Sequence, residues 1–131
     1  MDHHNAYFLR AEEFIEGARY EIEAERENSA TTLAYFAAYQ AAVGARIANG
    51  DRPDDRRDYW YHPRTATALD RYFKEWGEEE MQGELDLLRG FREDACYKVM
   101  GVRSGHVTQT LTRAERIIER IRHHLVDVIR T

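Results

Sequence analysis

The stretch from Ser29 to Ala48, SATTLAYFAAYQAAVGARIA, constrains the fold more than any other part of the chain. It consists largely of alanine, which favours helix, and Arg46 is its only charged residue. A helix that is apolar on one face and merely small on the others needs neighbours on several sides. We therefore predict that this stretch is the central helix of an all-α domain. Its larger aliphatic and aromatic residues at helical spacing are Leu33, Phe36, Val43 and Ile47.

The same stretch is about as long as a membrane-spanning helix. Tyr35, Tyr39 and Gln40 lie within it, however, and the rest of the chain is hydrophilic. We therefore expect a core helix of a water-soluble protein and no membrane contact.

Length and composition indicate one domain that covers residues 1–131. The chain is 43% hydrophobic and 33% charged and lacks alternating β-branched runs, so helix is the expected structure. Its formal charge of −5 gives no general attraction to nucleic acid, and contact with RNA would need a local basic patch. Cys96 is the only cysteine, and the first residues contain no apolar run typical of a signal peptide. We expect a reducing, cytoplasmic location.

Hydrophobic spacing predicts an antiparallel bundle of four long helices plus one short helix, joined mainly by brief connections. Asn28 and Ser29 predict a break and an N-cap before the central helix, and Asn49-Gly50 predicts a left-handed C-cap after it. A further turn is expected at residues 101–105. The helices are expected at about residues 5–27, 29–48, 65–76, 79–100 and 108–130.

Arg92 is the most informative single residue, because it falls within the apolar stripe of the fourth predicted helix. A guanidinium on a core-facing stripe is costly unless it is paired or reaches a polar cleft. One interpretation is a structural ion pair with a carboxylate such as Asp70 or Glu84. The other is an arginine that points into a groove, where it could bind a phosphate through two hydrogen bonds.

Residues 51–63, DRPDDRRDYWYHP, are the least regular part of the chain. The plain interpretation is a solvated loop whose aromatic side chains hold it against the bundle. The functional interpretation is a binding surface, because aromatic rings interleaved with arginines can stack on exposed bases. The candidate binding residues here are Arg57, Tyr59 and Trp60, with Arg56 and Arg64 nearby.

Three motifs in order along the chain resemble the HEPN family, the small helical domain of prokaryotic toxin–antitoxin and phage-defence proteins. The first is AYFAAYQAAVGARIANG, at residues 34–50, which is similar to the family's "YYAxFHAAxALL…G" helix. The second is His62 in HPRTATALDRYF, near the start of a short helix. The third is REDACY, where Arg92, Ala95 and Tyr97 match an "RxxADY" motif and Cys96 replaces its aspartate. The resemblance extends from about residue 31 to residue 125 and implies a HEPN-like helical bundle.

This resemblance implies RNA chemistry centred on Arg92. HEPN ribonucleases are metal-independent and use an R-x(4–6)-H motif across a dimer interface, where histidine moves a proton and arginine stabilises charge on phosphorus. Here the three positions after Arg92 that could hold this histidine are occupied by Tyr97, Lys98 and Val99. Tyrosine is a poor base at neutral pH. In some HEPN toxins, a partner nucleotidyltransferase adenylylates a motif tyrosine, which suggests a second role for Tyr97.

Other histidines could replace the missing one. His62 matches a family position, although it could equally cap or orient the short helix. His106 is close enough to Arg92 in sequence to share a cleft, or it could be a loop or capping residue. Arg116 and His123 satisfy R-x6-H in number, but their helical positions predict a solvated face.

Metal and cofactor motifs are missing from the sequence. No Cys or His pair has zinc spacing, and there is no glycine-rich phosphate loop of the nucleotide-binding types. We expect no metal and no cofactor.

The sequence thus predicts a HEPN-type RNA-acting protein of a toxin–antitoxin or phage-defence setting, with Arg92 as phosphate contact and Tyr97 and His62 in support. It could be a degenerate metal-independent ribonuclease. The expected partners are a second copy of the chain, RNA or a nucleotide, and a nucleotidyltransferase antitoxin. The alternatives are a non-catalytic module that binds a nucleotide or a protein, and a purely structural helical dimer.

Overall fold

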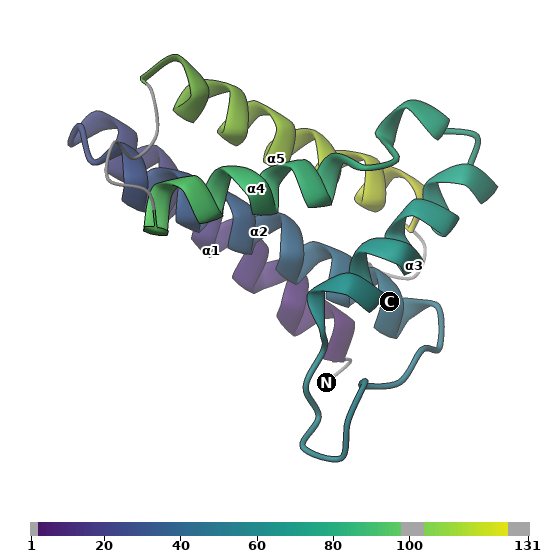
Figure 1. Ribbon diagram of the computed structural model, residues 1–131. Coiled ribbons are helices and arrows are strands. Elements are labelled where there is room, and N and C mark those ends of the chain that lie inside the picture. The colour runs from purple at the N-terminus through teal and green to yellow at the C-terminus, as the bar shows by residue number, and fades with distance from the viewer. Residues whose placement is uncertain (1–2, 98–103, 126–131) are drawn as a thin grey trace.

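The computed structural model of the protein describes residues 3–97 and 104–125 (Figure 1). These residues contain five α-helices, one 3-10 turn and no strand, so the all-helical fold predicted from the sequence is confirmed. No helix in this described part is both long and apolar enough to cross a bilayer. The elements are α1 (His3–Glu23), α2 (Glu27–Ala48), α3 (His62–Glu75), η1 (Glu79–Met81), α4 (Glu84–Tyr97) and α5 (Ser104–His124).

α2 is the central helix, because α1, α3, α4 and α5 all pack against it. Figure 1 shows α1 and α4 running antiparallel to α2, while α3 lies at the end of the bundle where α2 ends. The apolar face of α1 is buried, including Phe8 and Ile15. Small side chains let these helices approach α2 closely. The fully buried alanines of α2 are Ala37, Ala38, Ala41, Ala42 and Ala45.

Three helix ends share one geometry. After α2, the N–H of Gly50 bonds to the Ile47 carbonyl and that of Asp51 to the Arg46 carbonyl, at 3.0 and 2.9 Å. Gly50 has a φ of 82°, so this is a Schellman C-cap and the C-cap predicted at Asn49-Gly50 is confirmed. α3 ends in the same way at Gly77, whose φ is 77°.

α1 ends earlier than predicted, and α2 begins earlier. The same C-cap closes α1 at Glu25, a non-glycine residue with a φ of 61°. This turn leads directly into α2. The N-cap residue of α2 is Arg26, whose side chain makes no capping hydrogen bond. The N-cap predicted at Asn28 and Ser29 is therefore wrong, because both residues already lie inside the helix.

Two other helix starts also differ from the prediction. α3 begins at His62 rather than Thr65, because Pro63 suits the first turn of a helix. α4 begins at Glu84 rather than Glu79, because the chain first forms η1 and then turns at Gly83, which has a φ of 82°. Of the turn predicted at residues 101–105, the first three residues lie outside the described part, and α5 already begins at Ser104.

Glu78 lies in the connection between α3 and η1 and links this connection to the end of α5. Its buried carboxylate accepts hydrogen bonds from Arg120 Nε, at 2.5 Å, and from His124 Nε2. The His124 ring also stacks on Trp76, with 4.7 Å between ring centres. Burial alone would raise the pKa of Glu78, but the hydrogen bonds from Arg120 and His124 lower it below its usual value.

Candidate functional site

Arg92 extends from α4 over two aromatic rings of α2. Its guanidinium carbon lies 4.9 Å from the centre of the Phe36 ring and 5.6 Å from that of Tyr35. A guanidinium at these distances is attracted by the negative face of each ring. The position agrees with the sequence pattern, which placed Arg92 within the inward-facing stripe of this helix.

The Arg92 guanidinium forms no ion pair with any residue that the structure describes. The two carboxylates proposed as its partners bond elsewhere: Glu84 accepts from Arg113 Nη1 at 2.7 Å, and Asp70 accepts from the Gly83 N–H at 2.9 Å. Arg92 Nε is buried without a hydrogen-bond partner. Buried donors are nearly always paired, so this unpaired N–H needs an explanation.

His62, the first residue of α3, is held by partners on both of its ring nitrogens. Nε2 lies 2.8 Å from a carboxylate oxygen of Asp86, and Nδ1 lies 2.5 Å from the Tyr35 hydroxyl. Because a carboxylate only accepts, Nε2–H donates to Asp86, and in a neutral imidazole Nδ1 then accepts from the Tyr35 hydroxyl. The His62 side chain is only 9% exposed, whereas that of Asp86 is 61% exposed.

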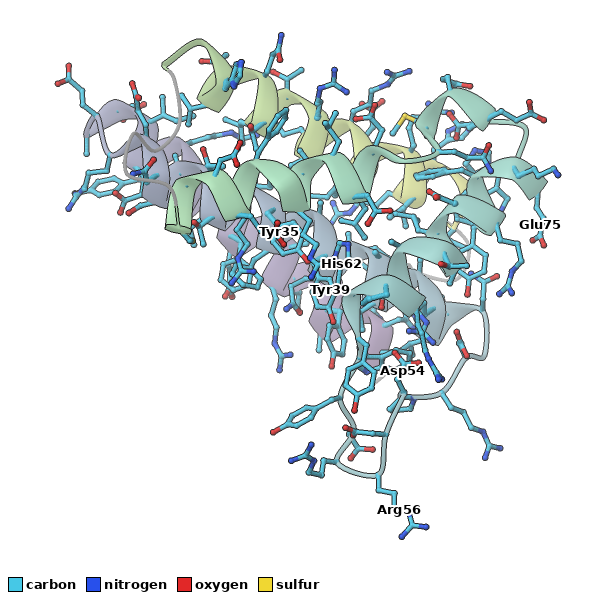
Figure 2. All side chains as sticks on the ribbon, in the orientation of Figure 1. Tyr35, Tyr39, Asp54, Arg56, His62 and Glu75 are labelled. Carbon is cyan, nitrogen blue, oxygen red and sulfur yellow. The ribbon has the colours of Figure 1, made fainter. Side chains whose placement is uncertain are left out.

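Tyr35 joins His62 to Arg92. Its ring centre lies 5.6 Å from that of His62, and the Tyr39 ring is stacked on the imidazole at 6.4 Å and on the Tyr35 ring at 6.0 Å. Figure 2 shows Tyr35, His62 and Tyr39 gathered between α2 and the start of α3. Burial raises the pKa of Tyr35 well above its usual value, and Arg92 lowers it only in part. The Tyr35 hydroxyl therefore stays protonated at neutral pH and donates to His62.

This chain of contacts from Asp86 through His62 and Tyr35 to Arg92 fixes the orientation of each group. The imidazole has no free nitrogen with which to take a proton from a bound molecule unless Tyr35 moves away. As it stands, the arrangement positions side chains, and the Arg92 Nε–H is left without an acceptor. The proposed catalytic role of His62 stays a prediction.

Of the two other predicted site residues, the structure places the side chain of His106 only. Tyr97 is the last residue of α4, and its side chain lies outside the described part. His106 is exposed in the first turns of α5, where its ring packs against Phe91 at 5.7 Å between ring centres. Phe91 is beside Arg92 in sequence, but no contact between His106 and Arg92 appears among the described residues.

The loop between α2 and α3 contains the remaining candidates. Trp60 is half-buried: its carbonyl accepts a hydrogen bond from the Tyr39 hydroxyl, and its ring lies 4.7 Å from the Arg46 guanidinium. It therefore holds the loop on the bundle, as the plain interpretation proposed. Tyr59, in contrast, is 54% exposed, and the Arg57 guanidinium covers its ring at 4.9 Å.

The base of this loop is a buried charge cluster. Arg46 donates two hydrogen bonds to Asp54, at 2.8 and 2.9 Å, one to Asp51 at 2.7 Å and one to Thr65 at 3.1 Å. Burial opposes the charge of Arg46, but the two aspartates raise its pKa above the usual value. The Arg46 hydrogen bond holds the pKa of Asp54 below its usual range. The cluster keeps the loop in one conformation.

Sequence reasoning overlooked Tyr35, Asp86 and Arg46 as parts of the site. A signal existed for Arg46, the only charge between Ser29 and Ala48. Tyr35 and Asp86 gave no comparable signal, because they meet only through His62.

The structure also describes the R-x6-H pair of α5, the weaker candidates Arg116 and His123. Both are exposed, so the predicted solvated face is confirmed. No group of three metal-ligating side chains occurs within the part of the chain that is described.

A family comparison agrees with the fold. The model of the family described as "HEPN domain" matches residues 4–124, which is nearly the whole chain. The chain belongs to the HEPN family. Membership is consistent with an RNA-related or nucleotide-binding role. A search of curated proteins gave no match. The resemblance proposed from the sequence is thus confirmed for the family, and its subgroup motif stays a prediction.

Proposed function

We propose that this HEPN protein binds RNA through a phosphate contact with Arg92, as a degenerate relative of the family's ribonucleases. The observation that supports this most directly is the state of Arg92. Its charge is balanced by no carboxylate among the described residues, and its buried Nε donates to no acceptor. A phosphate bound at the guanidinium would supply the opposite charge.

The rings of Tyr35 and Phe36 prepare Arg92 for this contact. They hold the guanidinium without neutralising it, so less side-chain entropy is lost when a ligand binds. Arg89 lies one helical turn before Arg92, and its side chain is 43% exposed with a weak 3.4 Å ion pair to Glu93. It supplies a second cation that an RNA backbone could recruit.

The biological setting follows from the family resemblance. We place the protein in a toxin–antitoxin or phage-defence system, as a homodimer with Arg92 at the interface. A nucleotidyltransferase antitoxin is its proposed partner, and Tyr97 is the tyrosine that this partner would modify.

RNA cleavage is the second candidate function, and the Asp86–His62 hydrogen bond favours it. A carboxylate that orients an imidazole is a common feature of general acid–base catalysis. For cleavage, the Tyr35 hydroxyl would have to leave Nδ1, so that a ribose 2′-hydroxyl could take its place. Tyr97 would be the alternative proton donor.

The experiment measures fluorescence anisotropy of a labelled single-stranded RNA with the wild type, Arg92→Ala and Arg116→Ala. Arg116 is a matched control, because it is exposed on α5 and forms only a 3.9 Å ion pair with Glu80. Loss of a charged hydrogen bond predicts about 10- to 100-fold weaker binding for Arg92→Ala. Equal affinity of the two variants would reject Arg92 as the phosphate contact.

A parallel incubation of the same RNA in EDTA separates binding from cleavage. Metal-independent cleavage that is lost in His62→Ala and Arg92→Ala would establish the ribonuclease. Binding without cleavage supports the degenerate RNA-binding protein.

A further inference from the structure

The loop between α2 and α3, residues 51–61, sorts its charges between two sides. Two of its four aspartates point inward: the side chain of Asp54 is 3% exposed and that of Asp55 is 18% exposed. The arginines point outward, as Arg57 shows with 75% exposure of its side chain. Arg52 and Arg56 are also exposed, and Figure 2 shows Arg56 at the tip, directed away from the helices. Of the other two aspartates, Asp51 accepts a hydrogen bond from Arg46 and Asp58 is exposed, so the segment presents more arginines than free carboxylates to solvent.

The inward aspartates build the loop from within. The Asp54 carboxylate binds Arg46 and also accepts from the Tyr61 N–H at 2.8 Å. The Asp55 carboxylate accepts from the N–H groups of Arg57 and Tyr59, at 2.8 and 3.2 Å. These bonds satisfy the Asp54 and Asp55 carboxylates and fix the backbone of the loop. The outer surface therefore exists before any ligand binds, and binding need not order the loop.

Aromatic rings accompany the arginines on this outer surface. Tyr59 is 54% exposed and Tyr61 is 41% exposed. The hydroxyl of Tyr61 is held by Asp55, and the ring of Tyr59 is covered by Arg57 at 4.9 Å. Flat rings with fixed orientation and adjacent guanidinium groups suit stacking on nucleobases.

We propose that the outer surface of the 51–61 loop binds unpaired nucleotides, with bases stacked on Tyr59 and Tyr61 and phosphates bound by Arg52, Arg56 and Arg57. The protein then selects single-stranded RNA. This inference rests on the proposed function, because it names the substrate class of the same RNA-binding protein.

The loop is linked to Arg92 through side chains packed within the bundle. His62 directly follows Tyr61 in sequence, and Tyr35 connects His62 to Arg92 through the contacts described above. A strand bound along the loop could therefore continue to Arg92. Figure 2 shows the labelled residues Tyr35, His62, Tyr39, Asp54 and Arg56 following one another from the middle of the bundle to the loop tip.

The pairing of rings with charge favours single strands over other polyanions. In a duplex the bases are already stacked on one another, so exposed tyrosines gain nothing from them. An acidic peptide would use the arginines but not the rings. Because the chain as a whole carries a charge of −5, binding depends on this local surface rather than on general attraction.

The test measures the anisotropy of a labelled 12-nucleotide RNA, as a single strand and as a duplex, with the wild type, Tyr59→Leu, Tyr20→Leu and Arg92→Ala. Tyr20→Leu is the matched control, because Tyr20 is an equally exposed tyrosine, at 64%, on α1. Loss of one stacked base predicts about tenfold weaker binding of the single strand by Tyr59→Leu and no change for Tyr20→Leu. The wild type should prefer the single strand by at least tenfold.

Each other outcome has a definite meaning. If Tyr59→Leu binds like the wild type while Arg92→Ala binds more weakly, the loop inference fails and the proposed function stands. Equal affinity for single strand and duplex, or equal competition by polyglutamate, also overturns the loop inference. If the wild type does not bind RNA at all, both proposals fail.

Discussion

Replacement of Arg46 by methionine tests whether the buried charge cluster holds the loop on the bundle. Methionine keeps the length of the side chain and favours helix, but it removes all four hydrogen bonds that Arg46 donates. Asp54, whose side chain is 3% exposed, then loses both of its contacts with this guanidinium. Its nearest remaining cation is Arg64, at 4.0 Å.

The expected loss in the free energy of unfolding is about 3–5 kcal/mol, the usual cost of leaving one partner of a buried ion pair without the other. A domain of this size is stable by about 5–15 kcal/mol, so the variant should remain folded but melt roughly 12–20 °C lower. Arg64→Met is the control. Its side chain is 70% exposed, so its removal should cost about 1 kcal/mol or less.

The effect should also depend on pH. The hydrogen bond from Arg46 lowers the pKa of Asp54 in the folded protein, so the pair stabilises the fold above the pKa of an unfolded aspartate, about 3.9. This stabilisation is lost as the pH falls through the lower folded pKa. The difference between Arg46→Met and the wild type should therefore be largest near neutral pH and shrink below about pH 4.

Urea denaturation followed by circular dichroism at pH 7 and pH 3.5 measures both effects. A loss below 1 kcal/mol at pH 7, or equal losses in Arg46→Met and Arg64→Met, would refute the conclusion that the buried cluster holds the loop on the bundle. A loss that does not shrink in acid would show that the aspartates are not the groups responsible.

Three further substitutions test the helix ends and the packing, each by urea denaturation. Glu25→Gly should stabilise the protein by about 0.5–1 kcal/mol, because glycine adopts the positive φ of 61° without strain, and unchanged or lower stability would contradict this. Gly44→Leu should cost about 1–3 kcal/mol, because a Cβ there would lie 3.0 Å from the Phe8 ring. Glu78→Gln should cost about 2 kcal/mol at pH 7 through its weakened bonds to Arg120 and His124. Because the pKa of Glu78 is lowered in the fold, this cost should decline below about pH 4.3, and a pH-independent cost would argue against it.

The helical architecture could be predicted because each helix carries its own signal. The apolar face of α1 repeats at helical spacing, and the alanine-rich α2 has small residues on every side, which matches its contacts with four other helices. The C-cap at Gly50 could also be predicted from the sequence, because glycine is the usual residue at that position. The end of α1 could not be predicted, because Glu25 adopts the same positive φ although glutamate rarely does so.

The site could be predicted only in part, because its geometry depends on contacts between distant segments. Arg92 was identified from its own helix, as a charge within an apolar stripe. The partners of His62 come from α2 and α4, and nothing in either local pattern indicates that Tyr35 and Asp86 meet there. The inward and outward sorting of charge in the loop likewise depends on Arg46, which lies on α2 and draws the aspartates toward the bundle.

The alanines of α2 set the distances between this helix and its neighbours. Ala37, Ala38, Ala41, Ala42 and Ala45 are all fully buried, so the separation of α2 from its neighbours is set by single methyl groups. A methyl group has no alternative rotamer with which to absorb a change, and a larger side chain would displace the surrounding helices. Arg92 extends from one of these helices onto rings carried by α2. The alanines therefore set the helix spacing that lets the Arg92 guanidinium lie on these rings. Variants that enlarge the alanines would displace Arg92 from the rings.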